Sequence, residues 1–159
     1  MLYSAVCMTL CAATTDTVTI RLDLAHAHDH SLHVTILPPH TISPGSVRFI
    51  LPSNVPGCVA ELKTGRLLTN LQAYTTDPTP LPIERLSLNE YLIPQADKLQ
   101  RIEYDIHDSW HWEDSHILIA QIGTSFIPDR QFLLNFHAIA GYLEGYEGAT
   151  YRVEIERPA

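Results

Sequence analysis

The chain has 159 residues, of which 45% are hydrophobic and 18% are charged, a balance typical of a globular rather than a disordered protein. This length predicts one domain, able to bury roughly 70% of the surface that its unfolded chain would expose. The formal net charge is −8, and the ten lysines and arginines form no basic run. Because nucleic-acid binding depends on clustered cations that neutralise phosphates, we expect no nucleic-acid partner.

The N-terminal segment MLYSAVCMTLCAA, residues 1–13, contains no charged side chain. It resembles the apolar part of a secretory signal but lacks the positive region that precedes it in such signals. Two interpretations of residues 1–15 stay open: a signal remnant, which would favour a periplasmic or secreted location, or a leading strand. The segment is too short to cross a bilayer as a helix, and no later segment is apolar enough, so we expect no membrane span.

The N-terminal segment also holds two of the three cysteines, Cys7 and Cys11, and the third is Cys58. An odd number of cysteines with no C-x-x-C pair does not build a disulfide framework. We therefore expect the fold to depend on its hydrophobic core.

Apolar residues occupy every second position from Thr17 to Leu24, which is the period of a strand with one buried face. The pattern resumes at 32–36, so the two runs predict a β-hairpin. Similar alternations follow at Val47/Phe49/Leu51, Leu71/Ala73/Thr75, Ile102/Tyr104/Ile106 and Tyr151/Val153/Ile155.

No segment keeps a helical period for three turns. The nearest, residues 58–68, is interrupted by Gly65 and predicts at most one short helix or 3₁₀ turn. Many short strands separated by turn signals, including several of the eleven prolines, predict a single all-β domain over residues 16–159. The expected fold is an antiparallel β-sandwich or open barrel with at most one or two short helices.

The stretch HAHDHSLH, residues 26–33, contains four of the nine histidines and raises the question of a metal site. His26, His28 and His30 fall between the two strands of the predicted hairpin. If the first strand continued regularly, these residues would point into the core. We therefore interpret them as an exposed hairpin tip and predict no metal site there, with metal binding as the alternative.

A second polar cluster, DIHDSWHWEDSH at 105–116, combines carboxylates and histidines with Trp110 and Trp112. Such a group could perform acid–base chemistry or stack on a ligand. The simpler interpretation is a strand that ends in a polar loop anchored by aromatic residues. The nucleotide-binding and serine-hydrolase motifs are missing, and no histidine is followed by glutamate, so HExxH is missing too. We predict no catalytic residue in this chain.

Three segments share an order and spacing that are more specific than any one of them. They are FILPSNVPGCVAELKTGRLLTNLQAYTTD (49–77), LSLNEYLIPQADKLQRIEYDIHDSW (86–110) and FLLNFHAIAGYLEGYEGATYRVEIERP (132–158). Together, over residues 16–158, they resemble the N-terminal domain of the glycyl aminopeptidase type of zinc metallopeptidase. Cys58 departs from the small or polar residue expected after the Pro-Gly turn.

The resemblance implies a non-catalytic β domain that packs beside the catalytic domain of the same peptidase and helps shape its substrate cleft. Zinc would belong to that catalytic domain, and no cofactor is expected in this chain. The residues that the resemblance marks as structural or interdomain are Pro56, Gly57, Asn135, Gly141, Tyr142, Glu144 and Gly145.

The loop at 135–148 is rich in glycine and tyrosine, and we expect it to face the catalytic domain. In the alternative interpretation it is a connector that covers one end of the sandwich. A different function stays open as well: an independent β-sandwich module that binds carbohydrate or peptide through Trp110, Trp112 and Tyr142.

Overall fold

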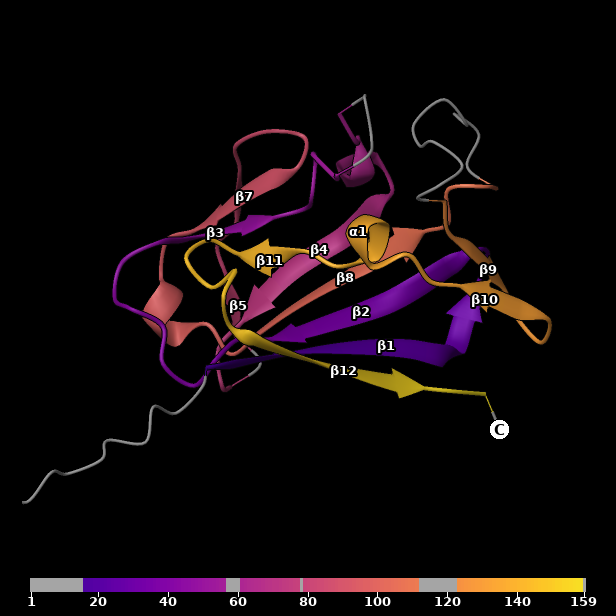
Figure 1. The fold of residues 1–159 in the computed structure, drawn as a ribbon. Coiled ribbons are helices and arrows are strands. Elements are labelled where there is room, and N and C mark those ends of the chain that lie inside the picture. Colours follow the sequence, from indigo (N-terminus) through magenta and orange to yellow (C-terminus); the bar gives the residue numbers. More distant parts are fainter. Residues whose placement is uncertain (1–15, 57–60, 78, 112–122, 159) are drawn as a thin grey trace, which may run out of the picture.

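The computed structural model of the chain describes residues 16–56, 61–77, 79–111 and 123–158 (Figure 1). Most of its strands form two sheets. The larger has the order β12-β1-β2-β8-β4-β5 and the smaller the order β11-β3-β7-β6. The strands of the larger sheet are β1 Thr17–His28, β2 Ser31–Leu37, β4 Leu68–Tyr74, β5 Pro80–Leu81, β8 Arg101–His107 and β12 Thr150–Glu156. Those of the smaller are β3 Val47–Ile50, β6 Glu84–Arg85, β7 Glu90–Ile93 and β11 Tyr142–Leu143.

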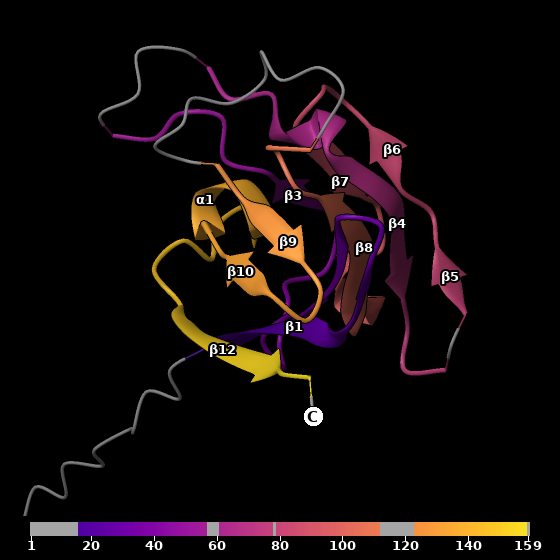
Figure 2. The same ribbon diagram turned by 90° about the vertical axis from the view of Figure 1, so that its right-hand side faces the viewer.

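The remaining elements are short. Strands β9 (Ser125–Ile127) and β10 (Gln131–Leu133) form a separate hairpin, which lies beside helix α1 (Phe136–Ile139) in Figure 2. Two 3₁₀ turns span Thr64–Arg66 and Ala96–Lys98. The first lies inside the segment 58–68, where the sequence predicted it. Among the described residues, no helix has the length and apolarity needed to cross a membrane.

The two sheets face each other across one hydrophobic core. Phe49 of β3 is fully buried, and its ring centroid lies 5.6 Å from that of Tyr104 on β8 and 6.3 Å from that of Tyr91 on β7. The predicted alternation holds on a strand of each sheet. Val47 and Leu51 are buried with Phe49, and Ile102 and Ile106 are buried with Tyr104. The expected all-β sandwich is confirmed.

The predicted hairpin is confirmed, but its first strand is longer than expected. β1 continues to His28, so His26 and His28 belong to the strand and not to the loop. The pairing of β1 with β2 is irregular between Asp23 and His28, which takes both histidines off the buried face and leaves them exposed. The turn itself is only Asp29 and His30, with φ of 46° and 59°, the left-handed conformation at both central positions of a type I′ turn.

Strand β12 departs most from the expected pattern. It pairs with β1 in parallel, whereas the other pairs of described strands are antiparallel. In this pairing Val153 lies opposite Ile20, and Ile155 lies opposite Leu22. Residues in register on paired strands share a side of the sheet, so Val153 and Ile155 lie on the core side, as Ile20 and Leu22 do. They are nonetheless 41% and 49% exposed. Because β12 lies at an edge of the larger sheet, the smaller sheet does not fully cover its core-side face.

Candidate functional site

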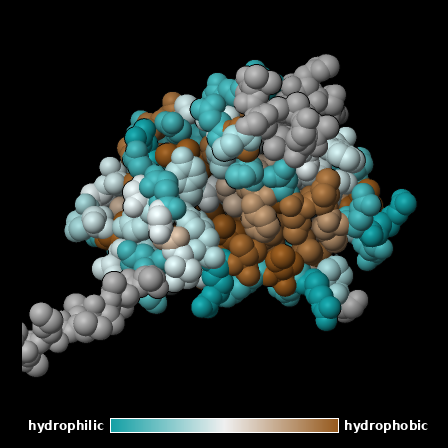
Figure 3. All heavy atoms as spheres, viewed as in Figure 1, coloured by the Kyte–Doolittle hydropathy of each residue, from teal (hydrophilic) through white to brown (hydrophobic). Residues whose placement is uncertain are grey.

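An apolar groove separates α1 from β12, and Figure 3 shows hydrophobic surface between these two elements. Its volume is ≈ 480 Å³. The residues that line it are Ile20, Phe136, His137, Ala140, Gly141, Tyr142, Glu147, Tyr151 and Val153. The exposed and partly exposed apolar residues in and beside the groove, here called the β12 surface, are Phe136, Tyr142, Tyr151, Val153 and Ile155.

The side of the groove opposite β12 is formed by residues 135–142, here called the groove wall, and a buried tyrosine holds it in place. The hydroxyl of Tyr104 donates a hydrogen bond to the carbonyl of Ile139 (2.9 Å) and accepts one from the N–H of Gly141 (3.3 Å). Burial raises the pKa of Tyr104, so the phenol stays protonated and keeps its donor. Asn135 begins the wall as the N-cap of α1, where its side chain accepts from the N–H of His137 (3.2 Å).

Tyr142 reaches the groove from β11, the edge strand of the smaller sheet. It pairs with Ile50 of β3, and just after the strand the N–H of Glu144 donates to the carbonyl of Arg48 (2.9 Å). Burial raises the pKa of Tyr142, and the nearby glutamates raise it further. The side chain therefore presents a neutral phenol, apolar in its body and polar at its tip, to the groove.

Glu144 has a structural partner on the neighbouring strand. The Nε of Arg48 donates to its Oε2 (2.8 Å), and a second guanidinium nitrogen contacts the other carboxylate oxygen. Hydrogen bonding and charge from Arg48 lower the pKa of Glu144. After Glu144 the chain turns through Gly145, whose φ of +84° favours glycine.

We expect the Arg48–Glu144 pair to make stability depend on pH. Because the folded pKa of Glu144 is lowered, the stabilisation is present above its ordinary pKa of 4.5 and is lost as the pH falls through the lowered value. Glu144→Gln should therefore lower the urea midpoint at about pH 7 more than at about pH 3. An equal difference at both pH values would contradict this assignment.

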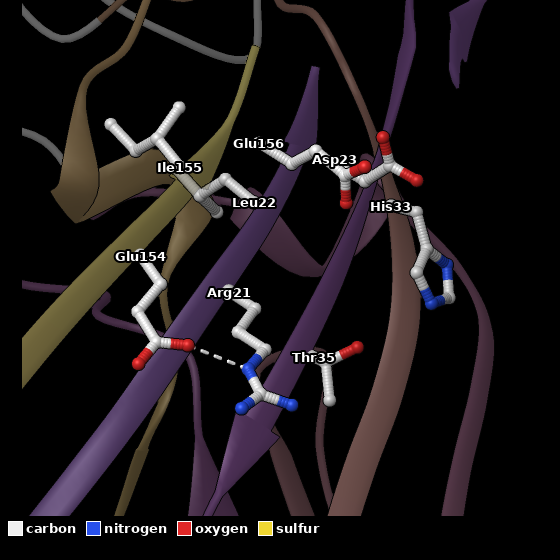
Figure 4. Close-up of a pocket in the computed structure, with 8 residues that line it drawn as sticks. All are labelled: Arg21, Leu22, Asp23, His33, Thr35, Glu154, Ile155 and Glu156. Carbon is white, nitrogen blue, oxygen red and sulfur yellow. Dashed lines mark hydrogen bonds and ion pairs between the residues drawn. The ribbon is translucent and has the colours of Figure 1, made fainter. Parts of the chain in front are cut away.

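A second hollow, of ≈ 460 Å³, lies against β12, β1 and β2 and is lined mainly by charged residues (Figure 4). Arg21 donates to Glu154 across it (2.7 Å), but the two side chains are half exposed, and such pairs contribute little. His33 contacts Asp105 at 2.8 Å, and Asn70 donates to the same carboxylate at 2.7 Å. Burial raises the pKa of Asp105, yet these partners outweigh it and leave the pKa lowered. Asp105 is thus a paired carboxylate and no general acid at neutral pH.

The two polar segments singled out in the sequence meet in the structure. His30 lies beside Asp108 and His111 at the end of β8, whereas His26 contacts Asp23 on its own strand. Sequence reasoning noticed both segments but not their contact, which depends on the pairing of β2 with β8. No local signal in either segment reports that pairing.

The remaining residues that the sequence singled out lie away from the groove or outside the described part of the chain. Trp110 is 56% exposed and is not among the residues that line the groove containing Tyr142. Pro56 is the last described residue before a gap, and Gly57, Trp112 and the segment 1–15 are outside the described residues. Their predicted roles stay predictions.

Comparison with known proteins shows which family this chain resembles in sequence and which solved structure it resembles in fold. A sequence model of the Peptidase M61 N-terminal domain matches residues 19–159. The chain belongs to this family. The resemblance inferred from the order of the three motif segments is therefore confirmed.

The M61 N-terminal domain also has a solved structural relative. A crystal structure of an aminopeptidase N family protein from Idiomarina loihiensis superimposes with a TM-score of 0.71 at 15% identity, covering 89% of this chain. The aligned part is 22% of that protein, so the chain spans about a fifth of its length. The likeness confirms the fold. A search of curated proteins found no significant match.

Proposed function

We propose that this M61 N-terminal domain is the non-catalytic β domain of a glycyl aminopeptidase-type zinc metallopeptidase. In this proposal it packs its β12 surface against the catalytic domain and helps shape the substrate cleft. The zinc ion and the groups that activate water are supplied by the catalytic domain. The observation that carries the proposal is the exposure of Val153 and Ile155 on the core side of an edge strand.

The β12 surface has the properties of a surface that a partner covers. Contiguous apolar patches rimmed by polar residues are uncommon on isolated domains and mark interaction sites. Phe136 is 38% exposed, and Tyr142 and Tyr151 lie beside it around the groove. Aromatic residues are enriched at interfaces because each combines a large apolar area with a polar tip.

The edge position of β12 supports the same assignment. Among the described strands, the seven-residue β12 is paired only on one side, by β1, and the other side of such an edge strand presents backbone groups for pairing. Proteins usually cover or charge such an edge, and β12 carries alternating charges on its outward face with Val153 and Ile155 on the other. A neighbouring domain would cover the apolar side and leave the charged side in water.

The non-catalytic role rests on the sequence. The peptidase motif of the resembled family needs two zinc-binding histidines and a glutamate that acts as general base, in the arrangement HExxH. No histidine of this chain is followed by glutamate. Tyr142, on the groove wall, is the residue that we place nearest the shared cleft.

The test places a charge on the proposed interface of the complete peptidase. Ile155→Asp should lower aminopeptidase activity by about tenfold or more, because an unpaired charge would be buried against the catalytic domain. The control is Leu86→Asp, which alters a residue of similar exposure, 45% against 49%, on the β6–β7 side of the fold. It should leave the activity unchanged.

Two further measurements make the test decisive. In the 159-residue chain alone, Ile155→Asp and Tyr142→Ala should shift the melting temperature by only about 2 °C, because both side chains are at least partly exposed. Unchanged activity of the complete Ile155→Asp peptidase would refute the interface. Peptide hydrolysis by the 159-residue chain itself would refute the non-catalytic role.

A further inference from the structure

Three potential metal ligands converge where the β1–β2 turn meets the end of β8. His30, Asp108 and His111 each offer one ligand atom, and the three atoms lie within 4.8 Å of one another. The two imidazole rings stack with centroids 3.9 Å apart and an interplanar angle of 16°. The Nδ1 of His111 is 2.7 Å from the Oδ2 of Asp108, and the Nδ1 of His30 is 3.4 Å from the same oxygen.

The backbone holds these residues together independently of their side chains. The N–H of Asp108 donates to the carbonyl of His30 (2.8 Å), which ties the turn to the strand end. His30 has a positive φ of 59°, which the two-residue type I′ turn requires. The Nδ1 of His30 is also 3.2 Å from the carbonyl of Phe126 on β9. This hydrogen bond would have to break for the same nitrogen to bind a metal ion, because a metal-bound nitrogen carries no proton.

The carboxylate of Asp108 is the anchor of the group. Its side chain is 0% exposed, while those of His30 and His111 are 44% and 37% exposed. It accepts hydrogen bonds from the backbone N–H groups of His111 (2.7 Å) and Phe126 (2.9 Å). These bonds fix its orientation but bring no full positive charge. A buried carboxylate is stable when a cation or a metal ion compensates it.

We propose that His30, Asp108 and His111 form a binding site for a divalent transition-metal ion of the zinc class. Two imidazoles and a carboxylate suit zinc and its first-row neighbours, whereas Mg²⁺ and Ca²⁺ prefer oxygen ligands alone. Zinc bonds of 2.0–2.1 Å in a tetrahedron place ligand atoms about 3.3 Å apart. The Nδ1 of His30 is already at about this distance from the Asp108 oxygen (3.4 Å), whereas the 2.7 Å contact of His111 is a hydrogen bond that would lengthen on metal binding.

Bound metal would join segments that are far apart in the sequence. His30 belongs to the first hairpin, and Asp108 and His111 follow β8, so the ion would cross-link the β1–β2 turn to the end of β8. Three protein ligands also leave a coordination position open to water or another ligand. The exposed histidines His26 and His28 take no part, because His26 contacts Asp23 and both precede the turn.

The test is a titration of the metal-stripped 159-residue chain with ZnCl₂ by calorimetry, and with CoCl₂ by visible absorption. We expect one ion per chain. His30→Ala and His111→Ala should each weaken binding by at least about tenfold, since even residues that only support a ligand cost 10–100-fold when they are changed. Zinc should raise the melting temperature of the unaltered chain and not that of either variant.

The matched control is the double variant His26→Ala/His28→Ala, which removes two exposed histidines from the same hairpin and should bind zinc like the unaltered chain. Folding of each variant is checked by circular dichroism, and the partial exposure of His30 and His111 makes their loss tolerable. Loss of binding only in the double variant would assign the ion to the hairpin histidines and overturn the proposal. Binding by the unaltered chain that is as weak as that of every variant would overturn it too, and would leave His111 and Asp108 as a hydrogen-bonded pair.

Discussion

Replacing Gly65 with alanine should lower the free energy of unfolding by about 3 kcal/mol or more. Gly65 is buried in the 3₁₀ turn before β4, and a Cβ there would overlap the backbone carbonyl of Leu88. The N–H of Gly65 also donates to the side chain of Asn89 (2.9 Å), whose amide in turn donates to the carbonyl of Leu62 (2.7 Å). A backbone carbonyl cannot rotate away as a side chain can, so the two loops would have to separate and break these bonds.

Urea denaturation of the 159-residue chain measures the effect. Gly148→Ala is the matched control, because a Cβ at Gly148 meets no atom within 4 Å and its backbone is not in the left-handed region. It should change the free energy of unfolding by less than about 0.5 kcal/mol. Similar midpoints for the two variants would show that the Gly65 and Leu88 loops do not pack as the structure has them.

Tyr104→Phe should cost about 1–3 kcal/mol of stability. The ring would keep its position beside Phe49 in the core, but the loss of the hydroxyl would leave the carbonyl of Ile139 and the N–H of Gly141 without their partner. Both groups are buried, so water cannot replace the hydroxyl without opening the segment. The segment is the wall of the groove that carries Tyr142.

Tyr146→Phe is the control for Tyr104→Phe. The Tyr146 hydroxyl also donates to a backbone carbonyl, that of Thr41, but its bond is longer (3.4 Å) and exposed. We expect a change below about 0.5 kcal/mol there. If the two variants had equal stability, the buried hydroxyl of Tyr104 would not be holding the wall.

The strands were predictable from the sequence because their signal is local. Val18, Ile20, Leu22 and Leu24 alternate along one segment, and all four are buried. The length of β1 was not predictable in this way. It depends on an irregular pairing before His28 and on a two-residue turn that contains no glycine, so neither feature left a recognisable pattern.

For the candidate sites as well, features within one segment were predictable and features that depend on the pairing of distant strands were not. The glycine- and tyrosine-rich loop at 135–148 was recognisable from composition, and Tyr142 does line a groove. The exposure of Val153 was hidden, because a core-like alternation does not reveal that its strand is at the edge of a sheet. The contact of His30 with Asp108 was hidden as well, since it requires the register that places Ser31 opposite His107.

The parallel pairing of the first and last described strands also determines when the domain can be completed. Arg21 and Glu154 meet across β1 and β12 although 133 positions separate them in the chain. At a synthesis rate of 5–20 residues per second, one side of β1 waits about 7–27 s for its partner strand. During that interval β1 is an open template for strands of other molecules, and a chaperone that shields it would act before β12 leaves the ribosome. We therefore expect translation speed between the two strands to influence how much of the protein folds correctly.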